Sequence, residues 1–289
     1  MLLTSMSWQL LTAISVLCLS ASVLLQRILI HKDKTDPYAY AVVFQGIVGV
    51  LLMTFAAIRG FTLPHVETVL LPAVVSVVAF GVGHIVYAKT LQHVEASAFS
   101  VLFATQAIWI MLLGIVLFHE TLTALQLLGS ALIFGSVVLL VKDIRALAAD
   151  KGTVLGLATG LLFGIAITAW SYVGRHTDGL SWAAISFVAT SLVAFCAKPS
   201  GTRKMRVLLT GSSLPKLLLL GVLYGAGSLA MLFAYRKGAF SIVTPLRQSS
   251  IIVTVLLALL LLPKERNRIP RKLLASAVCF AGVALIVIR

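Results

Sequence analysis

The sequence predicts an all-α membrane protein in which ten transmembrane helices form two inverted five-helix repeats. Two observations lead to this prediction. Apolar stretches of about twenty residues, the length that a helix needs to cross a bilayer, recur ten times along the 289 residues, and the last five repeat the pattern of the first five. Because five is an odd number, the second repeat must enter the membrane in the opposite orientation.

The composition excludes a soluble domain of this size. Hydrophobic residues make up 60% of the chain and charged residues 11%, and the mean hydropathy is +1.07. Soluble domains have about 25% charged residues. The stretches are continuously apolar, whereas the strands of a membrane β-barrel alternate in polarity. We therefore predict helices at 8–28, 38–58, 69–90, 97–118, 124–141, 153–174, 181–198, 216–236, 241–262 and 271–288.

The two predicted repeats cover residues 1–145 and 146–289, and they echo each other most clearly near their ends. In the first, Glu120 is followed by an apolar stretch that contains Gly129; in the second, Glu265 is followed by one that contains Gly282. Laying Ala96 on Ala239 places the fourth helix on the ninth and brings the two glutamates within two residues of each other. The start of the chain lacks the features of a removed signal peptide.

The net charge of +14 comes from basic residues at helix ends. A nucleic-acid-binding protein would instead gather them in a patch with stacking aromatic side chains. Seventeen lysines and arginines fall in loops that follow odd-numbered helices, and five fall in even-numbered loops or at the termini. The positive-inside rule then predicts that the odd-numbered loops are cytoplasmic and that both termini lie outside.

All nine acidic residues lie in loops or at helix ends, so no carboxylate is expected in mid-membrane. This pattern argues against a proton antiporter that works through a buried carboxylate. It also argues against a metal site, which would need clustered ligands. The chain has no Gly-Lys-Ser/Thr nucleotide loop and no HExxH or GxSxG motif. We therefore predict no catalytic residues, no metal and no cofactor.

Arg247 is the most informative single residue, because it falls inside the ninth predicted helix, shortly after Pro245. A guanidinium group there can hold a carboxylate or phosphate through two parallel hydrogen bonds. It can also snorkel to the interface or bind carbonyls that the proline frees. Gln248 follows it in a helix rich in hydroxyl residues, which can line a pathway or join neighbouring helices.

Other polar and aromatic residues inside the predicted helices are candidates for a substrate site. His84 is either a proton carrier or an ordinary interior histidine, and Tyr87 shares its helical face. Glutamines in mid-helix either bind substrate or hydrogen-bond to other helices, and aromatic residues either line a pocket or pack between helices. These remaining candidates are Gln45, Gln106, Trp109, Trp170, Tyr224 and Tyr235.

Glycines at four-residue spacing predict close helix contacts. Gly156, Gly160 and Gly164 form such a ridge on the sixth helix, and Gly221 and Gly225 repeat it on the eighth. These faces let helices approach closely. They suit a moving interface between repeats, a static bundle or a homodimer.

Four short motifs carry a family resemblance: Tyr87-Ala-Lys-Thr-Leu, Ala96-Ser-Ala-Phe-Ser, Glu120-Thr-Leu and Leu-Leu-Gly129-Ser-Ala-Leu-Ile-Phe-Gly135. In these motifs the chain resembles the ten-helix EamA-type members of the drug/metabolite transporter (DMT) superfamily. The similarity is closest over 87–141 and returns more loosely over 224–288. Such proteins usually carry a proline midway along helices 4 and 9, where this chain has Gln106-Ala107 and Ser249-Ser250. They also generally keep their termini in the cytoplasm, against the charge bias above.

The resemblance implies export or exchange of metabolites, amino acids among them. Together with Arg247, it predicts a secondary transporter that moves a small anionic or zwitterionic solute by alternating access in the plasma (inner) membrane. The expected partners are this solute and the lipid bilayer, and a nucleic acid is not among them. The alternative readings are a lipid-carrier flippase and a membrane scaffold that transports nothing.

Overall fold

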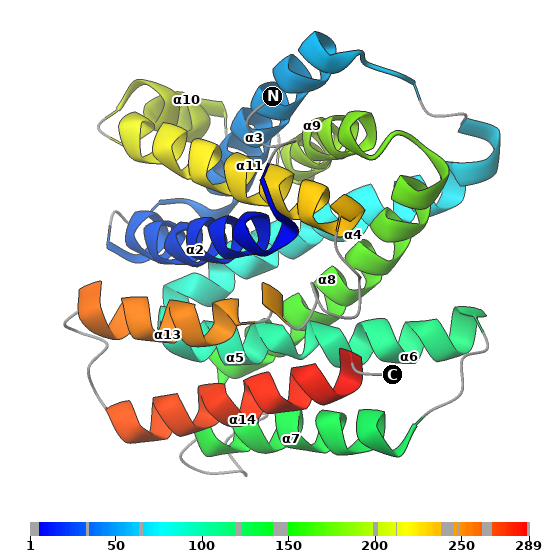
Figure 1. Cartoon of the computed structure of the whole chain (residues 1–289). Coiled ribbons are helices and arrows are strands. Elements are labelled where there is room, and N and C mark those ends of the chain that lie inside the picture. Colours follow the sequence, from blue (N-terminus) through cyan, green and yellow to red (C-terminus); the bar gives the residue numbers. More distant parts are fainter. Residues whose placement is uncertain are drawn as a thin grey trace.

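The computed structural model describes residues 6–32, 35–63, 66–118, 123–140, 150–198, 202–211, 213–237, 246–247, 249–261 and 268–287. Every regular element within these ranges is a helix, which confirms the predicted all-α class (Figure 1). The first half contains α2 (Trp8–Arg27), the π-helical turn η1 (Ile28–Lys32), α3 (Pro37–Arg59), α4 (Val66–His93), α5 (Ala96–Ala104), α6 (Gln106–Phe118) and α7 (Ala124–Leu140). The second contains α8 (Lys151–His176), α9 (Gly179–Ala197), α10 (Thr202–Thr210), α11 (Leu214–Lys237), α13 (Ser250–Leu261) and α14 (Ile269–Val287).

The predicted spans correspond to these helices. Within the described residues, eight helical stretches are long and apolar enough to cross a membrane, and Ala124–Leu139 and Ser250–Leu261 are shorter apolar helices. Where a predicted span and an observed helix both have a boundary among the described residues, the two boundaries agree within about three residues, except in the fourth and ninth spans. The described residues thus support a multi-pass membrane protein built on ten apolar segments.

The fourth predicted span crosses as one stretch, Ala96–Leu113, but its α-helix is interrupted at the single residue Thr105, between α5 and α6. The Thr105 backbone N–H donates to the Leu102 carbonyl at 3.2 Å, and its hydroxyl donates to the same oxygen at 2.7 Å. This three-residue hydrogen bond tightens the chain and ends the α-helical ladder. A hydroxyl side chain therefore produces the break without a proline.

The ninth span breaks in the same way. The Ser249 N–H and hydroxyl both donate to the Leu246 carbonyl, at 3.1 and 2.6 Å, just before α13 begins at Ser250. The two breaks therefore match residue by residue. Leu102 corresponds to Leu246, Thr105 to Ser249 and Gln106 to Ser250, and each pair is separated by the same number of positions in the sequence. This spacing differs by one residue from the alignment of Ala96 with Ala239 that the sequence suggested.

Contacts between helices keep the same correspondence. On α4, Gly83 packs against Leu162 and Phe163 of α8; on α11, Gly227 packs against Cys18 and Leu19 of α2. The sequence distance from Gly83 to Gly227 equals that from Thr105 to Ser249. The residues that face the two glycines, Leu162 and Phe163 on one side and Cys18 and Leu19 on the other, are the same distance apart. The halves therefore repeat in their packing as well as in their order of helices.

The two halves are interleaved. The most extensive helix contacts are those of α4 with α8, α7 with α14, α3 with α9 and α2 with α11, and each joins the first half to the second. In Figure 1, α7 and α14 lie side by side below the rest of the bundle, and α2 lies beside α11 above them. The main helix contacts of each half are therefore made with the other half.

Aspartates cap three of the helices. Asp36, Asp150 and Asp178 precede α3, α8 and α9, and their carboxylates accept hydrogen bonds from backbone N–H groups of the first turn. Such caps satisfy donors that a helix start leaves free. Acidic residues thus stabilise helix starts here, as expected from their positions at helix ends. Glu120 and Glu265 lie outside the described residues.

The segment between the seventh and eighth predicted spans contains a short helix, α10, which the sequence does not predict. Met205 and Leu208 are buried, whereas the basic residues Arg203, Lys204 and Arg206 are exposed. Nine residues are too few to cross a bilayer, so the span count does not change. The helix packs against α3 and α11 near one end of the bundle (Figure 1).

Among the described residues, one close backbone-to-backbone contact between the halves joins α7 to α14. A Cβ atom on Gly129 would lie 2.5 Å from the Gly282 carbonyl oxygen, and one on Gly282 would lie 2.6 Å from the Gly129 oxygen. Ile286 faces Gly129 and Ile133 faces Gly282, so the helices cross in opposite directions about a local two-fold axis. The same Gly-x-Ala-Leu-Ile sequence occurs on both sides of this crossing.

We predict that Gly129→Ala destabilises the protein by about 1–3 kcal/mol, because the new methyl group forces two backbones apart. Gly135→Ala on the same helix is the matched control, since a Cβ there meets no atom within 4 Å. Thermal unfolding of the purified proteins in detergent measures the difference. Equal unfolding temperatures for the two variants would contradict this account of the crossing.

A second prediction concerns orientation. The ends of α2, α4 and α9 and the starts of α10 and α14 lie at what we call the basic end of the bundle, where the odd-numbered loops are. Cys196, in the last turn of α9, is exposed there, whereas Cys18 is half-buried and Cys279 is buried. If the basic end is cytoplasmic, a membrane-impermeant maleimide should label inside-out vesicles but not intact cells. Cys196→Ser should remove the label, and labelling of intact cells would reverse the orientation.

Candidate functional site

An aromatic cluster surrounds His84 between α3, α4 and α8. The ring centroid of His84 lies 4.9 Å from that of Phe163, 6.0 Å from that of Phe44 and 6.1 Å from that of Tyr87. The side chain is buried, and its Nδ1 atom has no hydrogen-bond partner. His84 is therefore held by ring packing, and one of its nitrogens remains available for a proton, a water molecule or a solute.

Gln26 connects two tyrosines next to this cluster. The Tyr40 hydroxyl donates to Gln26 Oε1 at 2.9 Å, and the Tyr87 hydroxyl hydrogen-bonds the same side chain. Gln26, Tyr40 and Tyr87 come from α2, α3 and α4 and are all buried. Tyr40 also stacks on Phe44 at 5.6 Å. These bonds fix a polar group within the aromatic cluster.

The second half reaches this cluster through Tyr224 of α11. Its ring centroid lies 5.1 Å from that of Phe44 and 5.9 Å from that of Phe187 of α9. The positive charge of Arg247 acts on the Tyr224 hydroxyl, and the Arg247 side chain is half-buried. Thus Phe44 contacts both His84 and Tyr224, two candidates from the sequence. Two further candidates follow from these rings, because Tyr87 packs on His84 and the charge of Arg247 acts on Tyr224.

Several buried polar side-chain atoms have no hydrogen-bond partner among the described residues. Four of them occur in the part of the chain that the structure describes: Ser15 Oγ, Gln45 Nε2, His84 Nδ1 and Gln106 Oε1. They come from four different helices of the first half. Such an atom costs about 1–3 kcal/mol when it stays unsatisfied, so each needs an explanation such as a water molecule or a solute.

Gln106 begins α6 immediately after the break at Thr105, opposite the glycine ridge of α8. A Cβ on Gly164 would lie 3.3 Å from the Gln106 carbonyl and 2.6 Å from Trp109 Cβ. Trp109 thus packs on α8 beside the broken helix. The predicted ridge is confirmed at Gly156, Gly160 and Gly164, each of which faces α5 or α6; on α11, Gly221 packs against Ile47, but a Cβ on Gly225 would meet no atom within 4 Å.

Trp170 packs against the core that contains Tyr40 and Phe44, and its hydrogen bonds join it to α9. Its indole N–H donates to Ser186 Oγ at 3.0 Å, and its carbonyl accepts from the Trp182 indole at 3.2 Å. Both partners belong to α9, so Trp170 anchors α8 to α9. Gln248 lies outside the described residues, as does the side chain of Tyr235.

Sequence reasoning missed Gln26, Tyr40, Phe44 and Phe163. Gln26 lies beside Arg27 at the end of a predicted span, where a polar side chain usually faces the membrane interface. The phenylalanines resemble ordinary packing residues. The available signal was the polarity of Gln26, which breaks an otherwise apolar stretch one residue before the first basic side chain.

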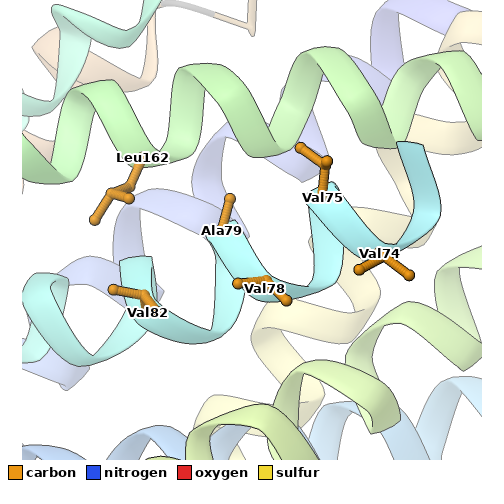
Figure 2. A pocket seen from close by; sticks show the side chains of 6 residues that line it. All are labelled: Val74, Val75, Val78, Ala79, Val82 and Leu162. Carbon is orange, nitrogen blue, oxygen red and sulfur yellow. The ribbon is translucent and has the colours of Figure 1, made fainter. Parts of the chain in front are cut away.

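An apolar groove of about 360 Å³ lies outside this region, on the surface of α4 and α8 (Figure 2). Five of its lining residues are on α4, and Leu162 on α8 projects toward them; the five are Val74, Val75, Val78, Ala79 and Val82. Val74 is 51% exposed and Val78 is 45% exposed. No lining side chain carries a polar atom, so the groove suits a lipid chain and not a polar solute.

Comparisons with known proteins agree with this architecture. A model of the EamA-like transporter family matches residues 6–142 and again residues 150–288. One solved structure, described only as "Crystal structure of protein", is 17% identical, with a TM-score of 0.61 over 95% of this chain and 96% of that one. At this identity the likeness shows the fold alone. No curated protein matches the chain.

We predict that Gln26→Leu lowers the unfolding temperature, because it leaves the buried hydroxyls of Tyr40 and Tyr87 without their shared partner. The cost is about 1–3 kcal/mol for each unsatisfied hydroxyl. Thr54→Val is the control, since it removes an exposed hydroxyl that bonds within its own helix. Adding Tyr40→Phe to Gln26→Leu should recover part of the loss, and no recovery would show that the Tyr40 bond contributes nothing.

Proposed function

Because this chain belongs to the EamA-like transporter family, as its resemblance to the DMT superfamily predicts, we propose that it is a secondary transporter of a small polar metabolite. The solute is anionic or zwitterionic, such as an amino acid, and its movement across the plasma (inner) membrane is export or exchange. The described residues that support this proposal lie where helices of the two halves meet.

The single observation that carries the solute class is the position of Arg247. It immediately follows Leu246, the carbonyl acceptor at the break before α13, and its charge reaches Tyr224. A guanidinium group pairs with a carboxylate or phosphate through two hydrogen bonds. Aromatic walls with a few directed polar groups are typical of small-molecule sites. Tyr224, on which the Arg247 charge acts, supplies such a wall, and Phe44 and His84 extend it through ring contacts.

Alternating access requires the halves to separate at one end while they close at the other. Two described ion pairs join the halves, and both are at the basic end: Lys204 with Asp36 at 2.7 Å, and Lys272 with Glu95. Burial disfavours the Asp36 carboxylate, but the bonds from Lys204 and the Ala39 N–H outweigh it, so the pKa of Asp36 lies below its usual value. The carboxylate is therefore ionised at neutral pH, and these contacts hold the basic end closed.

The paired breaks provide the matching hinges. Thr105 and Ser249 each interrupt a helix, and α5 packs against α13, so the two broken helices are neighbours. Backbone irregularity at membrane depth is tolerated where neighbouring helices or a water-filled cavity satisfy it. We propose that both breaks flex as the halves rock about the site.

We predict that Arg247→Ala raises KM for the transported solute by about 10- to 100-fold, the loss expected for hydrogen bonds to a charged group. Arg247→Lys should recover less than half of this in free energy, because lysine lacks the planar fork. The measurement is counterflow into proteoliposomes across a panel of amino acids, nucleosides and phosphorylated metabolites. Arg59→Gln, which removes an exposed arginine at the other end of α3, is the control.

Two outcomes would overturn the proposal. In the first, the protein moves no member of the panel and Arg247→Ala leaves every solute-induced thermal shift unchanged. In the second, the protein moves fluorescent lipid between leaflets and no soluble metabolite, which would favour the flippase.

A further inference from the structure

Two lysines share one tyrosine ring at the basic end of the bundle. Lys89 Nζ donates to the Tyr38 hydroxyl at 3.1 Å and lies 4.8 Å from the ring centroid. Lys198 Nζ lies 5.1 Å from the same centroid. The three residues come from the end of α4, the first turn of α3 and the C-terminus of α9. Two ammonium groups gathered around one ring make this point of the surface positive, which favours an anion beside them.

Asp36 supplies only part of the balancing charge. Its carboxylate pairs with Lys204 of α10 at 2.7 Å and also interacts electrostatically with Lys198. Three lysines therefore gather around one carboxylate and one aromatic ring. Arg203 and Arg206 add two exposed positive charges on the same short helix. Among the described side chains, positive charges therefore outnumber negative charges at this point of the surface.

Helix α10 carries apolar side chains beside these charges. Met205 and Leu208 are buried in the core that α3 shares, which fixes the helix against the bundle. Val207 is 62% exposed and Leu209 is 45% exposed, next to Arg206. A basic helix with apolar side chains on its outer surface lies in the membrane interface and favours anionic lipids. The environment that covers Val207 and Leu209 is therefore the headgroup and acyl boundary of the bilayer.

From this juxtaposition we propose that the Tyr38–lysine cluster (Tyr38, Lys89, Lys198 and Lys204) and α10 form a binding site for one anionic phospholipid. The lipid phosphate lies between the ammonium groups, and its glycerol and first acyl carbons cover Val207 and Leu209. The basic end is the predicted cytoplasmic end, where the leaflet carries negative lipids. Lys204 also forms the ion pair with Asp36 that links the two halves. The bound lipid would therefore contact the ion pair that holds the basic end closed.

The test is lipid binding to the purified full-length chain in neutral detergent at low ionic strength. Phosphatidylglycerol, the anionic probe, is titrated against phosphatidylcholine, and thermal unfolding and native mass spectrometry report binding. We expect phosphatidylglycerol to raise the unfolding temperature and to stay bound at a ratio of one. Each lysine near an anionic headgroup contributes roughly a fivefold factor in affinity. Lys198→Gln should therefore weaken binding about fivefold, and adding Lys89→Gln should weaken it by about 25-fold.

Arg59→Gln is the matched control, because Arg59 is also an exposed cation over an aromatic ring, 5.4 Å from Phe55, but at the opposite end of α3. It should leave phosphatidylglycerol binding unchanged. Unfolding temperatures in phosphatidylcholine alone should be equal for all these variants, which shows that they fold. Equal losses for Arg59→Gln and Lys198→Gln would reduce the effect to overall charge and overturn the site.

Two further measurements separate the lipid from a free anion. Glycerol 3-phosphate and inorganic phosphate should cause less than a tenth of the shift that phosphatidylglycerol causes at the same concentration. Val207→Ser combined with Leu209→Ser should weaken phosphatidylglycerol binding severalfold. A full shift with free phosphate would assign the cluster to a soluble anion and overturn the lipid site, as would unchanged lipid binding in the Val207 and Leu209 variant.

Discussion

The fold depends on close approach between helices of opposite halves. In a bilayer the hydrophobic effect does not drive helices together, so association relies on tight packing and on interhelical hydrogen bonds. Glycines provide that packing: Gly49 faces Val188, Gly129 faces Gly282, and Gly160 faces Thr105. Each of these contacts crosses from one half to the other. A larger side chain at such a position would open the seam along which the halves meet.

The same seam accounts for the position of the polar residues. A polar group that faced lipid would lose its hydrogen bonds without compensation, so polar side chains collect where helices from both halves exclude lipid. Gln26 and Tyr40 satisfy each other there, whereas Gln45 and Gln106 keep an atom without a partner. Gln45 and Gln106 belong to α3 and α6, which pack against α9 and α8 of the other half.

The sequence predicted the class of fold well, because span length, hydropathy and odd repeat number are each set by the bilayer. It failed at the two helix breaks and at α10. Thr105 and Ser249 look like ordinary interior hydroxyls, and only the bond back to the residue three positions earlier reveals their effect. It also missed Gln26 and Phe44, because their importance arises from contacts between helices that are distant in the sequence. The sequence singles out His84, Tyr87, Tyr224 and Arg247 because each is polar within an apolar stretch, and their role in a solute site stays a prediction.

The two halves share the same backbone break but differ in one side chain beside it. At the spacing that relates Thr105 to Ser249, Arg247 corresponds to Phe103. Phe103 packs against Tyr87 and Phe163 and belongs to the aromatic cluster of the first half. The break itself is therefore symmetric, and the side chain two residues before it is apolar in one half and cationic in the other. A symmetric pair of hinges can rock equally well toward either side of the membrane. We propose that a single arginine holds a negative charge at one point along that path, so the proposed preference for an anionic group rests on this departure from symmetry.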